Sequence, residues 1–108
     1  MLVAKKIDRR TIDKPELTVL CSYYNNMNTI KNSLESVFKQ SFKNIEIIIY
    51  SDGSNDSSDK IVKKIIKKKN NVLFLKSNKN QGLTKSLNFM LKFSRAKYIA
   101  RHDADDIS

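Results

Sequence analysis

Apolar residues along the chain alternate between two spacings. Short, nearly continuous apolar runs at residues 17–22, 45–50, 72–75 and 97–101 are typical of strands that are covered on both faces. Between these runs, apolar residues recur at helical spacing. They are Ile30, Leu34, Val37 and Phe38, then Ile61, Val62, Ile65 and Ile66, then Leu83, Leu87, Met90 and Leu91. Strand–helix units in succession predict an α/β fold, Rossmann-like, with a mostly parallel sheet and helices on both faces.

Residues 1–16 lack such a pattern and end in Lys14-Pro15-Glu16, so we expect a loose lead-in there and one domain over residues 17–108. A chain of 108 residues can bury about two thirds of its unfolded surface. No apolar run in the sequence has the length of a membrane span, and no signal-peptide pattern is visible. The single cysteine, Cys21, lies in an apolar run, and we expect it to be buried.

The formal net charge is +10, which attracts polyanions such as anionic lipid, nucleic acid or phosphorylated small molecules. Much of the excess lies in residues 60–69, where lysines occupy the face opposite the isoleucines. A solvated helix face is the first interpretation, and contact with an anionic membrane is the alternative. Nucleic acid is disfavoured as a partner because no aromatic residues interleave these lysines. We expect a cytoplasmic location, with contact at the inner face of the membrane left open.

Polar residues gather directly after each predicted strand, where α/β folds form their ligand crevice. They are Tyr23, Tyr24 and Asn25 after the first strand, Asp52 after the second, Asn80, Gln81 and Gly82 after the third, and Asp103 and Asp105 after the fourth. An Asp-x-Asp at a strand end favours a divalent cation that also binds a diphosphate, with a solvated acidic turn as the alternative. The glycine-rich phosphate-binding patterns are absent from the sequence, so a metal would have to carry more of the phosphate charge.

Four stretches in order, Ser22-Tyr23-Tyr24-Asn25-Asn26, residues 44–56, Asn80-Gln81-Gly82-Leu83 and residues 98–106, resemble the N-terminal half of family 2 glycosyltransferases. The resemblance implies a GT-A fold, here truncated. It also implies transfer of a sugar from a nucleotide diphosphate sugar, most often a UDP-sugar, to an acceptor hydroxyl, usually with inversion. The acceptor would be a glycan or a lipid-linked glycan, in polysaccharide biosynthesis.

The resemblance also implies residue roles, each with an alternative from the residues themselves. Tyr23, Tyr24 and Asn25 would lie along the nucleotide, although the two tyrosines could be packing residues. Asp52 would bind the base, or it could cap the helix that follows. Residues 80–82 would contact the donor, or they could only form the turn that begins a helix. Asp103 would lie near the ribose and the metal, and Asp105 would be the direct ligand of Mn²⁺ or Mg²⁺. His102 is expected to pack against the sheet, with a role as a metal ligand as the lesser alternative.

Three departures from the family pattern bear on function. Ser51 stands where the family often has a first Asp, Leu87 stands where many members have an Arg, and the sequence stops at Ser108. The general base that deprotonates the acceptor is therefore expected beyond Ser108, so we expect a donor-binding half that transfers sugar poorly alone. Its last strand should have an exposed edge that favours a homodimer. A non-catalytic nucleotide- or metal-binding module and a basic interaction domain stay open as alternatives.

Overall fold

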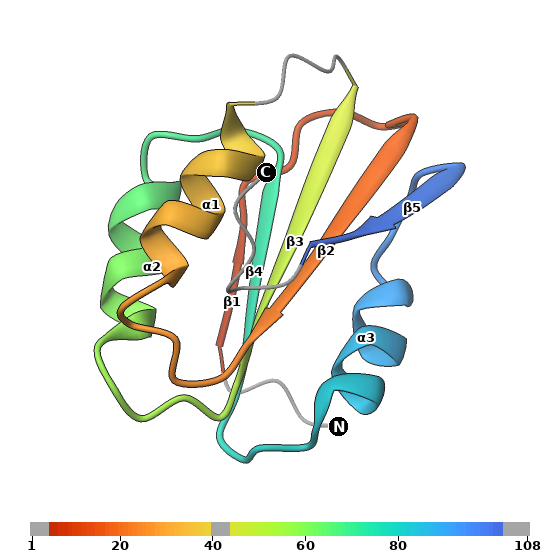
Figure 1. Ribbon diagram of the computed structural model, residues 1–108. Helices are drawn as coiled ribbons and strands as arrows, with labels where there is room; N and C mark the ends of the chain where they lie inside the picture. The colour runs from red at the N-terminus through yellow and green to blue at the C-terminus, as the bar shows by residue number, and fades with distance from the viewer. Residues whose placement is uncertain (1–4, 40–43, 103–108) are drawn as a thin grey trace.

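The computed structural model describes residues 5–39 and 44–102, which form one five-stranded sheet with three helices (Figure 1). The sheet order is β1-β4-β3-β2-β5. The elements are β1 (Lys5–Asp8), β2 (Leu17–Tyr23), α1 (Ile30–Phe38), β3 (Ile45–Asp52), α2 (Ser58–Ile66), β4 (Val72–Ser77), α3 (Leu83–Leu91) and β5 (Tyr98–Arg101). Strands β2, β3, β4 and β5 pair in parallel, and β1 joins β4 antiparallel. The predicted mostly parallel α/β sheet is confirmed.

Helices cover both faces of the sheet, as the apolar pattern predicted. Helices α1 and α2 lie on one face and α3 lies on the other (Figure 1). Strand β3 alternates between the two layers: Ile47 and Ile49 pack with the α1 and α2 side chains, whereas Ile48 and Tyr50 pack on the α3 side. A strand that is buried on both faces needs apolar residues at nearly every position, which explains the continuous run.

Strand β1 corrects the expected loose lead-in. It pairs with β4 in the register Lys6↔Leu75, and the backbone N–H of Arg9 donates to the carbonyl of Val72 at 2.8 Å. The strand reads Lys-Lys-Ile-Asp and is mostly exposed. An edge strand with one apolar residue carries no periodic signal, so the sequence pattern could not reveal it.

Strand β5 lies at the opposite edge of the described sheet. Its Tyr98 and Ile99 are 60% and 44% exposed, which agrees with the expectation of an uncovered apolar edge. No helix within residues 5–39 and 44–102 has the length and apolar character needed to cross a bilayer. Cys21 is buried in the core, as expected.

Candidate functional site

The loop after β2 is fixed to the loop after β3 through Asn25. The backbone N–H of Asn25 donates to Ser54 Oγ at 3.0 Å, and Asn25 Oδ1 accepts from the backbone N–H groups of Asn55 and Asp56 at 2.8 and 3.3 Å. Asn25 has a φ of +51°, in the left-handed region that asparagine enters more readily than most residues. These two loops therefore form one connected surface at the carboxyl edge of the sheet.

Asp52 connects the same surface to the loop after β4. Its Oδ1 accepts from the backbone N–H of Gln81 at 2.8 Å, and its Oδ2 accepts from that of Gly82 at 2.9 Å. We name this pair of bonds the Asp52 bridge. The residue is 3% exposed. Each carboxylate oxygen has two lone pairs, so the bridge leaves acceptor capacity for a ligand N–H.

The alternative role of Asp52, as the cap of the helix that follows, is not what the structure shows. Both carboxylate oxygens of Asp52 bond to residues 81 and 82, and the carboxylate that meets the start of α2 is that of Asp56, whose Oδ1 accepts from the backbone N–H of Ser58 at 2.8 Å. Asp52 instead brings residues 80–82 to the loop after β3, which joins two of the groups that the sequence analysis had selected separately.

Gly53 allows the loop after β4 to rest directly on the loop after β3. Its φ is +77°, and a Cβ at this position would lie 2.5 Å from both the backbone N of Asn80 and the backbone C of Lys79. Such distances are far inside van der Waals contact, so only glycine fits. Gly82 also has a left-handed φ, +92°, but open space surrounds the position of its Cβ.

The two tyrosines of the first loop have different environments. Tyr24 is 45% exposed beside Asn25, where a ligand ring can reach it. Tyr23 is 3% exposed within the core under α1 and α2, and its hydroxyl donates to the Asp59 carboxylate. The structure thus favours the packing alternative for Tyr23 and leaves Tyr24 as the surface residue.

Asp59 is a buried acid that the sequence analysis did not select. Its carboxylate accepts from the Tyr23 hydroxyl, from Ser51 Oγ at 2.6 Å and from Lys76 Nζ. Burial alone would raise the pKa of Asp59, but the bonds from Lys76, Ser51 and Tyr23 outweigh it and hold that pKa below its ordinary value. Burial and the bond to Asp59 raise the pKa of the Tyr23 phenol, so the phenol stays protonated and donates.

The proposed metal ligands Asp103 and Asp105 lie outside the described residues, and so does the nucleotide contact expected of Asp103. Within residues 5–39 and 44–102, no cluster of three or more His, Cys, Asp or Glu side chains could hold an ion. The ligand set expected from the sequence stays a prediction.

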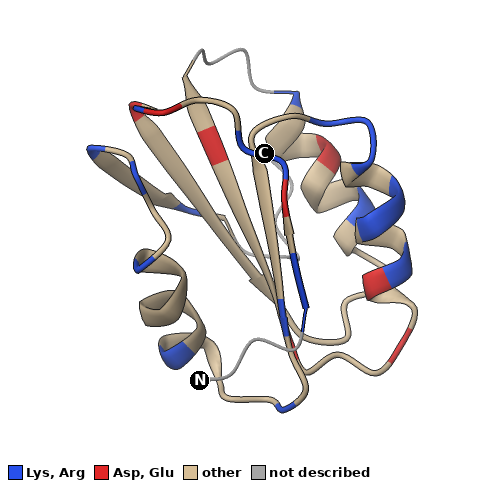
Figure 2. Cartoon of the chain, turned by 180° about the vertical axis from the view of Figure 1, so that it is seen from behind, with Lys and Arg blue, Asp and Glu red and all other residues tan. Residues whose placement is uncertain are grey.

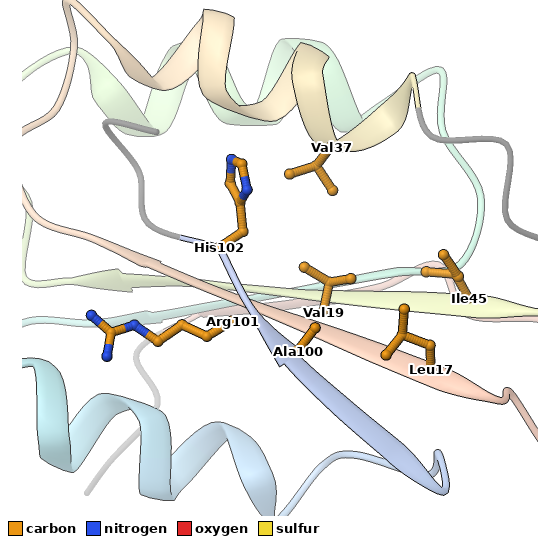
Figure 3. Close-up of a pocket in the computed structure, with 7 residues that line it drawn as sticks. All are labelled: Leu17, Val19, Val37, Ile45, Ala100, Arg101 and His102. Atoms are coloured by element: carbon orange, nitrogen blue, oxygen red, sulfur yellow. The ribbon is translucent and has the colours of Figure 1, made fainter. Parts of the chain in front are cut away.

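His102 is the last described residue before that segment. The sequence analysis expected it to pack against the sheet, and the structure places its side chain against α1. Its Nε2 lies 2.9 Å from Ser33 Oγ, and its backbone N–H donates to the Leu20 carbonyl at 2.9 Å. Figure 3 shows His102 and Val37 facing one another beside a cavity of about 200 Å³, whereas Arg101 points to the opposite face of the sheet. Since β5 runs parallel to β2, His102 lies at the same carboxyl edge as the loops described above.

Comparison with known proteins agrees with this architecture. Residues 18–108 match the family model described as Glycosyl transferase family 2. The glucosyltransferase WfaP of Escherichia coli, named UDP-Glc:alpha-D-GlcNAc-diphosphoundecaprenol beta-1,3-glucosyltransferase, is 37% identical over 83% of this chain and 35% of its own length. The chain spans about a third of the length of the first curated relatives that it matches.

Two solved structures share the fold. TarS of Staphylococcus aureus in complex with UDP-GlcNAc superposes with a TM-score of 0.78 at 28% identity, over 85% of this chain and 27% of TarS. The mannosyltransferase PcManGT of Pyrobaculum calidifontis, in complex with GDP-Man and Mn²⁺, gives a TM-score of 0.81 at 19% identity, over 87% of this chain and 28% of its own. The sequence match and the GT-A architecture together show that the chain belongs to glycosyl transferase family 2.

Proposed function

We propose that the protein transfers a sugar from a nucleoside diphosphate sugar to an acceptor hydroxyl, and that these residues supply the donor-binding part. The observation that carries the proposal is the joining of three loops at the carboxyl edge of the sheet by Asn25 and Asp52. The complex of TarS with UDP-GlcNAc supports a UDP-sugar as the donor. The acceptor named for WfaP, a diphosphoundecaprenol-linked sugar, supports a lipid-linked glycan as the acceptor.

The proposed roles follow the positions of the side chains. Tyr24 stacks on the base because it is the exposed ring of the first loop. Asp52 accepts from a base N–H with the lone pairs that the Asp52 bridge leaves over. The loop of Asn80, Gln81 and Gly82, held by that bridge, lies along the donor.

The proposal includes dependence on Mn²⁺ or Mg²⁺, with Asp103 and Asp105 as the residues that hold the ion. The structure of PcManGT, which contains Mn²⁺ with GDP-Man, supports a divalent ion in this fold. When bound, the ion would offset the negative charge that develops on the departing diphosphate. Inversion at the anomeric carbon is the stereochemistry that the family resemblance favours. The acceptor's general base is assigned to none of the 108 residues.

Titration calorimetry with the full-length protein tests the donor site. We expect UDP to bind in the presence of Mn²⁺, and we expect Asp103→Ala and Asp105→Ala each to abolish the metal-dependent binding without changing the circular dichroism spectrum. Asp13→Ala, which removes an exposed carboxylate outside the loops, is the matched control and should bind normally. Absence of nucleotide binding, or binding that survives both substitutions, would contradict the proposal. Transfer assays with donor and acceptor then separate an enzyme from a non-catalytic binding module.

A second proposal concerns a groove between α1 and α2, which we suggest contacts the anionic surface of a membrane on its cytoplasmic side. The groove has a volume of about 420 Å³. Its lining residues are Lys31, Glu35, Ile61, Lys64, Ile65, Lys68 and Lys69. Figure 2 shows the basic residues along α2 and on the segment that follows it. An apolar floor bordered by lysines suits a lipid surface, which offers phosphates next to acyl chains.

Homodimerisation through β5 also stays a prediction. Strand β5 forms one edge of the sheet within the described residues, and its Tyr98 and Ile99 are exposed; such an edge with apolar side chains favours association. Sedimentation velocity over a range of concentrations would reveal the dimer.

A further inference from the structure

The Asp59 carboxylate, in the first turn of α2, accepts hydrogen bonds from residues at the C-terminal ends of three strands. Tyr23 ends β2, Ser51 is the penultimate residue of β3, and Lys76 is the penultimate residue of β4; all three donate to Asp59. Tyr23 and Ser51 share Oδ1, and Lys76 takes Oδ2. We name these four residues the Asp59 network.

Each member of the Asp59 network lies next to a loop of the proposed donor site. Tyr23 precedes Tyr24 and Asn25, and Ser51 precedes Asp52. Lys76 leads into the loop of residues 80–82, and its Nζ also lies 3.4 Å from the Ser54 carbonyl in the loop after β3. A change at Asp59 therefore reaches all three loops, although Asp59 lies in α2 and has no place among the proposed ligand contacts.

The Asp59 network contains a buried ion pair. Asp59 is 7% exposed, and Lys76 is its ion-pair partner. Without the carboxylate, the lysine and two hydroxyls would lose their common acceptor in a buried site, which is costly. The Ser51 hydroxyl, near the end of β3, lies 2.6 Å from this carboxylate, which comes from α2.

We propose that Asp59 is a positioning residue of the donor site. It places a negative charge from α2 against the ends of β2, β3 and β4, and it holds these strand ends so that Asn25, Asp52 and residues 80–82 meet the nucleotide in one arrangement. The inference rests on the proposed function for its link to the nucleotide. Its effect on the loops can be tested without a ligand.

The inference is tested by moving the carboxylate from position 59 to position 51. Asp59→Asn keeps the shape of the side chain and removes its charge, and we expect the UDP affinity of the full-length protein to fall by about tenfold, the loss expected when hydrogen bonds to a charged group no longer hold the strand ends. Ser51→Asp places a second carboxylate beside the first, where the two negative charges repel each other, so it should also weaken binding. The double variant S51D/D59N has one carboxylate again, and we expect it to bind UDP better than either single variant.

Hydrogen exchange gives a readout that does not depend on nucleotide. The backbone N–H groups of Gln81 and Gly82 donate to Asp52, next to Ser51. Their exchange should become faster in D59N and return toward the wild-type rate in S51D/D59N. Asp13→Asn is the control, because it removes an exposed carboxylate that lies outside the Asp59 network and outside the three loops.

The outcomes separate the two proposals. If the wild type binds no nucleotide but exchange at residues 81 and 82 follows the predicted order, the proposed function fails and the positioning role of Asp59 stands. If D59N leaves both UDP affinity and exchange unchanged, or if S51D/D59N is no better than D59N, the inference is overturned.

Discussion

A comparison of Gly53 with Gly82 tests whether the loops after β3 and β4 must lie in direct contact. Both have a left-handed φ, but only Gly53 faces backbone at 2.5 Å. Gly82→Ala should cost about 1–2 kcal/mol of unfolding free energy, the strain of an alanine in this region. Gly53→Ala carries the same strain and also forces the loop of Lys79 and Asn80 away, so it should cost about 3 kcal/mol or more.

Urea unfolding monitored by circular dichroism measures both variants. Nucleotide affinity should fall more in Gly53→Ala than in Gly82→Ala, because displacement of residues 79 and 80 disturbs the Asp52 bridge as well. Equal losses of stability in the two variants would show that the close approach at Gly53 relaxes without consequence.

Glu46 holds several elements together at the other end of the sheet. It is fully buried in β3 on the α3 side, and it accepts from Thr18 Oγ1 at 2.6 Å and from the backbone N–H of Arg95 at 2.7 Å. Arg10, which follows β1, donates to it at 3.2 Å. One carboxylate thus connects β2, β3, the segment after β1 and the turn before β5.

Glu46 gives the protein a predictable sensitivity to acid. Burial alone would raise its pKa, but the bonds from Arg95, Thr18 and Arg10 outweigh burial and hold the pKa below the ordinary value of 4.5. A folded-state pKa below the unfolded one means that the stabilisation is complete above about pH 5 and is lost as the pH falls through the folded-state pKa. Unfolding free energy should therefore decline below about pH 5.

Glu46→Gln should flatten that decline and destabilise the protein by about 3 kcal/mol at pH 7, since Arg10 loses a buried partner. Urea unfolding between pH 3 and pH 7 measures both effects. Glu16→Gln removes an exposed carboxylate directly before β2 and should change neither the stability nor its pH dependence. The same pH slope in wild type and Glu46→Gln would contradict the assignment.

At the scale of the whole molecule, the proposal for the basic groove between α1 and α2 predicts binding to anionic membranes. A lysine near an anionic surface contributes about 1 kcal/mol, so Lys64→Gln with Lys68→Gln should lower affinity for vesicles that contain phosphatidylserine by more than tenfold. Binding should also weaken steeply with salt. Co-sedimentation with vesicles measures both effects.

The control for the membrane experiment lies on the other face of the sheet. Lys85→Gln with Lys92→Gln makes the same change of charge beside α3 and leaves the groove intact. If this pair weakens vesicle binding as much as Lys64→Gln with Lys68→Gln, the attraction comes from net charge alone. Binding that withstands Asp103→Ala and Asp105→Ala would further show that the surface acts apart from the donor site.

The large-scale arrangement could be predicted because its cause is periodic. Strands buried on both faces and helices with one apolar face leave regular patterns, and parallel topology brings the strand ends to one edge. Asn25, Asp52 and Gly82 were therefore found as neighbours from sequence. Strand β1 left no pattern because it is a short edge.

The Asp59 network could not be predicted, for a different reason. Asp59 lies 36 residues from Tyr23 and 17 from Lys76, and the contact depends on the lateral order of β2, β3 and β4. An acid in the first turn of a helix is ordinary, so nothing in the sequence distinguished it from a residue that interacts with the helix dipole. The burial of Tyr23 follows from the same contact.

The Asp52 bridge has a consequence for how donor preference can change over generations. Its two donors at residues 81 and 82 belong to the main chain, which every amino acid except proline supplies. In the proposed donor site, a substitution at Gln81 therefore changes the side chain beside the donor while the two bonds to Asp52 stay in place. Donor preference could therefore change by substitution at this position without loss of the loop arrangement.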